Sequence, residues 1–136
     1  MSTLLRIENV SVHFPIRKGL LQRQVGAVRA VDSVTLELKK GEAFGLVGES
    51  GCGKTTLARA VLRLVDPISG IISFDGTNIS GLTTKALAPF RKRIAAIFQD
   101  PFSSLNPRQR SGQIIAEVLQ VHNYEGDIKE RVVELL

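Results

Sequence analysis

Residues 48–55 read Gly-Glu-Ser-Gly-Cys-Gly-Lys-Thr, a complete phosphate-binding loop of the form G-x-x-x-x-G-K-[ST]. This feature constrains the fold most, because such a loop is expected between a buried strand and a helix. Its glycines permit the tight turn that points several backbone N–H groups at one anion. Lys54 adds a mobile positive charge for the outer phosphates, and the Thr55 hydroxyl is expected to bind Mg²⁺.

The residues on either side of the loop fit that requirement. Residues 43–47 form a short apolar run, which predicts a buried strand. Residues 56–64 predict a helix with apolar residues on one face, from Leu57 to Leu64. The order of strand, glycine loop and helix predicts an α/β fold, and the helix dipole adds positive potential at the loop.

Three further strands are indicated before and after this unit. Alternating apolar and polar residues predict strands over residues 5–14 and 34–38, which are separated by a basic loop over residues 15–26. A strand over residues 71–74 ends at Asp75-Gly76, a strong signal for a hairpin turn. These segments predict an antiparallel sheet attached to the phosphate-binding unit.

The second half of the chain is predicted to be mainly helical. A strand is expected over residues 94–98. Ser111 and Asp127 are plausible N-cap residues for the last two helices, with Glu130 completing a capping box. The predicted helices cover residues 84–91, 113–120 and 128–136.

Composition excludes several classes of partner and environment. With 136 residues, 43% of them hydrophobic, the chain suits one small globular domain. The net charge is +5, but no aromatic residue interleaves with a basic run, so we expect no nucleic-acid partner. Cys52 is the single cysteine, which excludes an internal disulfide and favours a reducing compartment. No apolar run approaches the roughly 20 residues of a membrane helix, so membrane contact is expected only through a partner.

The phosphate loop and a second segment together resemble a known family. The loop through Thr56, followed by Phe98-Gln99-Asp100-Pro101, resembles the nucleotide-binding subunit of an ABC transporter. The longer string over residues 98–108 is similar to the ATP-binding subunits of the oligopeptide, dipeptide and nickel importers. The resemblance covers the whole chain and implies the N-terminal part of one ABC nucleotide-binding domain, with a P-loop NTPase (RecA-like) core.

The resemblance also implies how the chain is divided. Residues 1–47 would form the antiparallel β-subdomain and a core strand, and residues 48–100 would run from the phosphate loop to the Q-loop. Residues 101–136 would begin a helical subdomain.

The resemblance implies a site for ATP and Mg²⁺. Thr55 and Gln99 would bind Mg²⁺, and Lys54 and Gln99 would contribute to catalysis. Phe14 matches the position of the adenine-stacking aromatic residue, although a core phenylalanine is the alternative. The expected ATP-binding residues are Phe14, Gly48, Glu49, Ser50, Gly51, Cys52, Gly53, Lys54, Thr55, Thr56 and Gln99.

The catalytic set of the resembling family is expected to be incomplete here. Ser111-Gly112-Gln113 is interpreted as the start of a helix and not as the family's signature segment. His13 and His122 are interpreted as surface residues, and no second apolar strand ends in Asp-Glu. Phosphoryl transfer needs several parts at once, so the chain alone is predicted to bind ATP without turnover and to be part of a longer protein.

Three functional hypotheses follow. The first is an ATPase subunit that energises an importer of peptides or related small solutes, peripheral to the cytoplasmic face of the membrane. Its partners would be a second ATP-binding subunit, identical or not, and transmembrane permease subunits. The second is a non-catalytic nucleotide-binding or interaction fragment, and the third is another phosphoryl-transfer enzyme, such as a small-molecule kinase, on the same loop.

Overall fold

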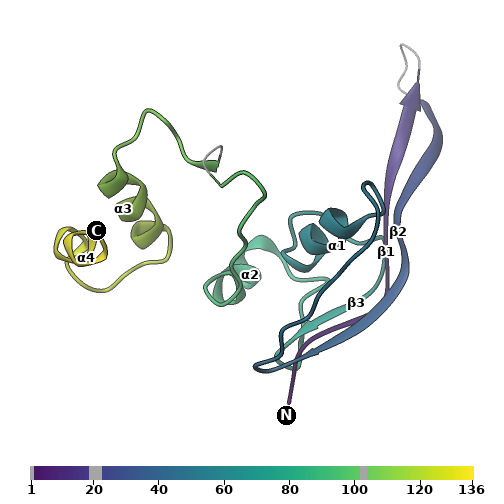
Figure 1. The fold of residues 1–136 in the computed structure, drawn as a ribbon, viewed down its shortest axis with the longest axis horizontal. Helices are drawn as coiled ribbons and strands as arrows, with labels where there is room; N and C mark the ends of the chain where they lie inside the picture. Colours follow the sequence, from purple (N-terminus) through teal and green to yellow (C-terminus); the bar gives the residue numbers. More distant parts are fainter. Residues whose placement is uncertain (1, 19–22, 102–103) are drawn as a thin grey trace. The chain divides into compact units, whose positions relative to one another are not determined.

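A computed structural model describes residues 2–18, 23–101 and 104–136 of the chain. The chain forms two compact units, Met1–Ile94 and Ala95–Leu136, which are described separately below. Figure 1 shows the elements of each unit in sequence colours. The first unit contains the sheet and the phosphate loop, and the second contains a pair of helices.

The sheet of the first unit is antiparallel, as the alternating pattern predicts. It comprises β1 (Thr3–Lys18), β2 (Arg23–Lys39), β3 (Ser69–Phe74) and β4 (Thr77–Asn78), in the order β2-β1-β3-β4. The predicted hairpin turn at Asp75-Gly76 is confirmed, because Phe74 pairs with Thr77 across it. Its two residues have φ of 48° and 80°, the positive pair that a type I′ turn requires.

The hairpin of β1 and β2 is longer than predicted (Figure 1). The expected loop over residues 15–26 is wrong in its described part, since β1 continues to Lys18 and β2 begins at Arg23; residues 19–22 lie outside the described chain. Pairing of β1 with β3 ends at Ser11, and among the described residues only β2 pairs with β1 beyond that point. Pro15 has no backbone N–H group to donate to a neighbouring strand. It is tolerated in this part of β1 because one edge of the strand requires no hydrogen-bond donor.

The core of the first unit lies between one face of the sheet and two helices, α1 (Lys54–Val61) and α2 (Thr84–Arg91). The bounds of α2 match the prediction, with Pro89 inside its last turn. The helix after the loop begins at Lys54, two residues earlier than predicted, and Leu64 lies beyond its end and is exposed. The buried residues of this core are Ile7, Val10, Val12, Val31, Leu57, Ala60, Ile72, Phe74, Ile79 and Leu87.

Two predicted strands, residues 43–47 and 94–98, do not form. Both segments are irregular, and all five residues of the first are exposed. A strand needs a neighbour for its N–H and C=O groups, and within the described residues no strand pairs with either segment. An apolar run signals a preference for burial, but it does not supply the neighbouring strand.

The second unit is a helical pair, α3 (Ser111–Val121) against α4 (Ile128–Leu135). Asp127 caps α4 as predicted, since its carboxylate accepts from the backbone N–H groups of Lys129 and Glu130 at 2.7 and 3.1 Å. Ser111 is not the cap of α3, which was predicted to begin at residue 113. It is the first helical residue, and the cap position belongs to Arg110, whose backbone N–H donates to Gln113 Oε1 at 2.9 Å.

None of the helices in the described part of the chain is both long and apolar enough to cross a bilayer. The longest of them, α3, has 11 residues.

Candidate functional site

The phosphate loop follows the backbone path that its glycines predict. Gly51 and Gly53 have φ of 82° and 94°, which L side chains rarely adopt. Gly53 is the N-cap of α1, and no side chain caps the helix there. The first N–H groups of a helix have no partner within the helix. The start of α1 therefore offers backbone donors and the positive end of its dipole to an anion.

Close contact with β2 seats the loop on the sheet. A Cβ atom at Gly53 would lie 2.1 Å from the carbonyl oxygen of Ala30. Ala30 is an extra residue in β2, because Val12 pairs with Val31 while the next residue of β1 pairs with Arg29. Such a bulge re-aims the backbone. Only glycine fits where the loop meets this bulge, so the position of the loop on the sheet is sterically fixed.

The Lys54 side chain forms hydrogen bonds with the backbone of its own loop. Its Nζ donates to the carbonyl oxygens of Gly48 and Glu49 at 2.7 and 2.6 Å and lies 3.4 Å from Cys52 Sγ. The thiol is close to Gly48 as well, since a Cβ there would lie 2.7 Å from Sγ. The ammonium group thus lies against its own loop, and an incoming phosphate would compete with two carbonyl oxygens for it.

A pocket of about 340 Å³ adjoins the loop. Cys52, Gly53 and Lys54 form one wall, and residues 30–32 of β2 form another. The remaining lining residues are Val34, Leu46, Val47 and Leu57. Apolar walls with a few converging charged groups are typical of small-molecule sites, and the volume is at the lower end of their range.

The other predicted residues of the first unit are exposed or partly exposed. Thr55 lies exposed in the first turn of α1, and Thr56 beside it is half-buried. Phe14 is 42% exposed on β1, opposite Val28 of β2, so it is not a core side chain. Gln99, the second residue predicted to bind Mg²⁺, belongs to the Ala95–Leu136 unit and is exposed. A Mg²⁺ site formed by Thr55 and Gln99 together stays a prediction.

The two histidines are half-buried, and not fully at the surface as predicted. His13 lies in β1, and its Nε2 atom is buried without a hydrogen-bond partner in the described structure. His122 follows the end of α3 and lines a different pocket. Among the described residues, no three His, Cys, Asp or Glu side chains form a group that could hold a metal ion.

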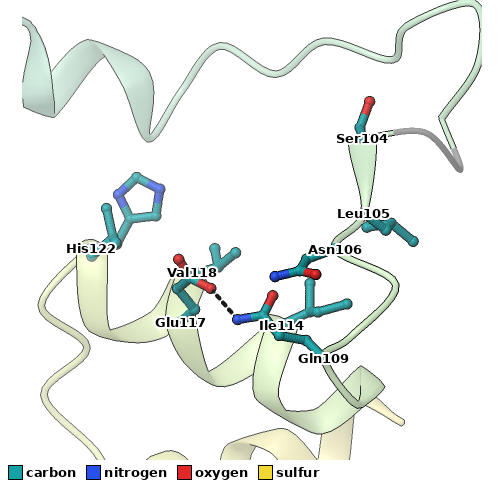
Figure 2. A pocket seen from close by; sticks show the side chains of 9 residues that line it. Ser104, Leu105, Asn106, Gln109, Ile114, Glu117, Val118 and His122 are labelled. Atoms are coloured by element: carbon teal, nitrogen blue, oxygen red, sulfur yellow. Dashed lines mark hydrogen bonds between the residues drawn. The ribbon is translucent and has the colours of Figure 1, made fainter.

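That second pocket lies wholly within the second unit and has a volume of about 410 Å³. Figure 2 shows α3 on one side and the segment from Ser104 to Gln109 on the other, with Gln109 Nε2 donating to Glu117 at 3.0 Å. Its apolar residues are Leu105, Ile114, Val118 and Val121. The segment that carries the subfamily resemblance therefore helps to form a groove with α3.

Residues 30–32 are lining residues that the sequence pattern does not single out. They lie within a strand and far from the loop in sequence, so spacing gives no signal. One indirect signal exists, since a glycine before the lysine of the loop can mean close approach of another backbone. Which backbone approaches is set by the bulge at Ala30 and is visible only in the folded chain.

Loop, helix and antiparallel sheet place the protein among the P-loop nucleotide-binding cassettes. A family model described as ABC transporter matches residues 31–135, so the chain belongs to the ABC transporter family. Solved structures agree on the fold. The dimeric structure of MJ0796, a bacterial ABC transporter cassette, matches with a TM-score of 0.77 and 23% identity over 96% of this chain and 55% of that one.

Curated relatives are ATP-binding proteins of transport systems. The chain is 50% identical to the oligopeptide transport ATP-binding protein AppF of Bacillus subtilis, over 98% of this chain and 42% of that protein. It is 48% identical to the probable peptide ABC transporter ATP-binding protein y4tS of Sinorhizobium fredii, over 90% of this chain and 34% of that one. The glutathione import ATP-binding protein GsiA of Pectobacterium atrosepticum is 47% identical, over 98% and 22%. The chain thus spans less than half the length of these relatives.

Proposed function

We propose that the chain binds Mg-ATP and belongs to an ATP-binding subunit that energises an ABC-type importer of peptides or related small solutes. The observation that carries the proposal is the phosphate loop seated on β2, with Lys54 and the start of α1 beside a pocket. Relatives named for oligopeptide and glutathione transport support the class of cargo.

Each residue of the site has a role in this proposal. Backbone N–H groups of residues 48–56 surround the phosphates, and the Lys54 ammonium leaves its loop carbonyls for the outer phosphate oxygens. The Thr55 hydroxyl and Gln99 bind Mg²⁺. Phe14, whose ring is partly exposed on β1, stacks against the adenine.

Binding without turnover is the expected behaviour of the 136-residue chain by itself. Phosphoryl transfer requires a group that positions the attacking water and further charges around the transferred phosphate. In ABC transporters the opposite subunit supplies part of this set, which the described residues around the loop do not provide. We therefore propose that catalysis requires a second ATP-binding subunit, of the same or a different kind.

Transmembrane permease subunits are the other proposed partners, and they place the protein at the cytoplasmic face of the membrane. The groove between α3 and residues 104–109 supports this part of the proposal. Apolar side chains line the groove together with Glu117 and His122 (Figure 2). All of these residues belong to the part of the chain that follows Gln99. Such a surface suits an amphipathic partner segment.

Calorimetric titration of the chain with Mg-ATP tests the nucleotide site. Lys54→Ala should weaken binding about 10–100-fold, because hydrogen bonds to a charged group are lost. Lys85→Ala is the matched control, since Lys85 is an exposed lysine in the first turn of α2. Equal affinities for Lys54→Ala and the parent would refute the proposal.

Release of phosphate distinguishes the alternatives. Steady hydrolysis by the pure chain would show that the catalytic set is complete. Transfer of phosphate to an added acceptor would indicate a kinase on the same loop.

A further inference from the structure

Beyond Ser11, within the described part of the chain, the hairpin of β1 and β2 continues as a two-stranded ribbon (Figure 1). Its pairing is regular over residues 13–16 of β1 and 26–29 of β2. Residues that pair across two strands point to the same face, and so do alternate residues of one strand. Three apolar side chains therefore share one face of the ribbon, the apolar ribbon face: Phe14, Ile16 and Val28.

The apolar ribbon face is accessible and consists of hydrocarbon. Its three side chains are between 39% and 52% exposed. Gly26 occupies the fourth position, and Ile16 lies beside it, since a Cβ at Gly26 would be 3.8 Å from Ile16 Cδ1. Strand alternation places the polar residues His13 and Arg29 on the opposite face. Among the described residues, this face therefore has no side-chain donor or acceptor.

This face is continuous with the surface that the phosphate loop contacts. A Cβ at Gly53 would lie 3.7 Å from Val31 Cγ2, and Val31 pairs with Val12. Both valines belong to the buried core that α1 covers. Val12 and Phe14 are alternate residues of β1, so they share a face and lie about 7 Å apart along the strand. The apolar ribbon face thus begins just beyond the loop contact, on the same side of the hairpin.

The chemistry of this face suits one part of a nucleotide. A nucleotide held by its phosphates at the loop has a ribose and a base to place on neighbouring surface. A base has π faces, which stack on aromatic and apolar side chains, and polar edges, which only donors and acceptors distinguish. The side chains of the apolar ribbon face contact a π face and offer nothing to the edges. Such stacking tolerates different bases, because every base has a π face.

We propose that the nucleobase lies on the apolar ribbon face, with Ile16 and Val28 as contact residues beside Phe14, and that the site accepts purine nucleoside triphosphates whatever their polar edges. This inference rests on the proposed nucleotide site and widens its substrate class from ATP. Purines rank above pyrimidines, because a larger ring system covers more apolar surface.

Calorimetric titration with ATP, GTP, CTP and inorganic tripolyphosphate, each with Mg²⁺, tests the proposal on the 136-residue chain. ATP and GTP should bind within about threefold of each other, because stacking is tolerant of base identity. Tripolyphosphate, which has no base, should bind about tenfold more weakly than ATP, the effect of losing one stacked base, and CTP should fall between them. A difference of tenfold or more between ATP and GTP would show that a polar edge is recognised and would overturn the inference.

Ile16→Ser combined with Val28→Ser tests the two contact residues. This double variant should weaken ATP and GTP by the same factor, about fivefold to tenfold, because apolar contact with the base is lost. Its affinity for tripolyphosphate should equal that of the parent, which also shows that the loop is intact. Ala27→Ser is the matched control, since Ala27 is exposed on the opposite face of the ribbon, and all its affinities should equal those of the parent.

A second copy of the chain is the competing occupant of this face. Sedimentation of the parent and the double variant tests it: a dimer that the double variant abolishes, with unchanged nucleotide affinities, would overturn the inference. Equal losses of ATP and tripolyphosphate affinity would do the same. In these cases Lys54-dependent ATP binding by the parent would leave the proposed function intact, whereas no ATP binding by the parent would refute both.

Discussion

Gly53 carries two independent constraints at the residue scale. Its φ of 94° disfavours any L side chain, and its α-carbon lies against the Ala30 carbonyl of β2. The first constraint belongs to the loop itself, and the second belongs to the contact with the sheet. Residues of this kind connect the geometry of a site to the stability of the fold, because one substitution disturbs both.

Gly53→Ala should lower the free energy of unfolding by at least the roughly 1–3 kcal/mol of an unfavourable backbone conformation, with the clash at Ala30 adding to it. Urea unfolding followed by circular dichroism measures the loss. Gly81→Ala is the control, since a Cβ at Gly81 meets nothing within 4 Å. Similar midpoints for the two variants would contradict the tight seating of the loop on β2.

At the scale of elements, one carboxylate joins a turn to the ends of β2 and α2. Asp75 accepts from Lys40 Nζ and from Arg93 Nη2, each at 2.7 Å. The Arg93 guanidinium also lies 4.9 Å from the centre of the Phe74 ring, which meets Phe90 of α2 edge-on. Hydrogen bonds from Lys40, then from Arg93, lower the pKa of Asp75. The β3–β4 turn is thereby tied to residues that follow two other elements.

The lowered pKa of Asp75 predicts a pH-dependent stability. A depressed carboxyl pKa contributes stability above the unfolded value of about 3.9, and this contribution is lost as the pH falls through the lower folded pKa. Asp75→Asn should therefore be less stable than the parent at neutral pH and approach it below about pH 4. Asparagine keeps the turn, because it tolerates positive φ.

Urea unfolding at a series of pH values tests this prediction. Arg93→Gln removes one of the two cations and should give an intermediate pH dependence. A difference between Asp75→Asn and the parent that stays constant from pH 7 to pH 3 would contradict the role of the ion pairs.

At the scale of the whole molecule, apolar surface remains uncovered on each of the two units. Val47 is 90% exposed in the segment before the phosphate loop, and Ile97 is 91% exposed before Gln99. An apolar hollow of about 190 Å³ lies in the first unit, where Phe44 and Leu46 meet Leu36 of β2 and Leu57 of α1. Exposed apolar patches of this kind indicate association with other protein surface.

The chain by itself should therefore bind a hydrophobic dye and associate with itself as its concentration rises. Phe44→Ser combined with Leu46→Ser should lower dye fluorescence markedly with little loss of stability, because both side chains are about half exposed, at 51% and 45%. Val28→Ser is a matched control on β2, 52% exposed and outside the hollow. No dye binding by the parent would show that these residues are covered in solution.

Local chemistry explains which features the sequence by itself determined. The positive φ angles of Gly51 and Gly53, the Asp75-Gly76 turn and the cap at Asp127 each depend on neighbours within a few residues, and the turn and the cap form as predicted. The bounds of α2 follow for the same reason. Glycine spacing and side-chain capping act over short distances, so the pattern alone is sufficient.

Only the tertiary structure decided the features that depend on a distant partner. Residues 43–47 and 94–98 have the composition of strands but form none, because a strand also needs a neighbour to accept and donate its hydrogen bonds. Pro15 is tolerated in β1 because, within the described part of the chain, no second strand pairs with that stretch of β1 on the edge away from β2. The contact of Gly53 with Ala30, and with it the place of residues 30–32 in the pocket, arises from a bulge in a strand far from the loop in sequence, which no local pattern records.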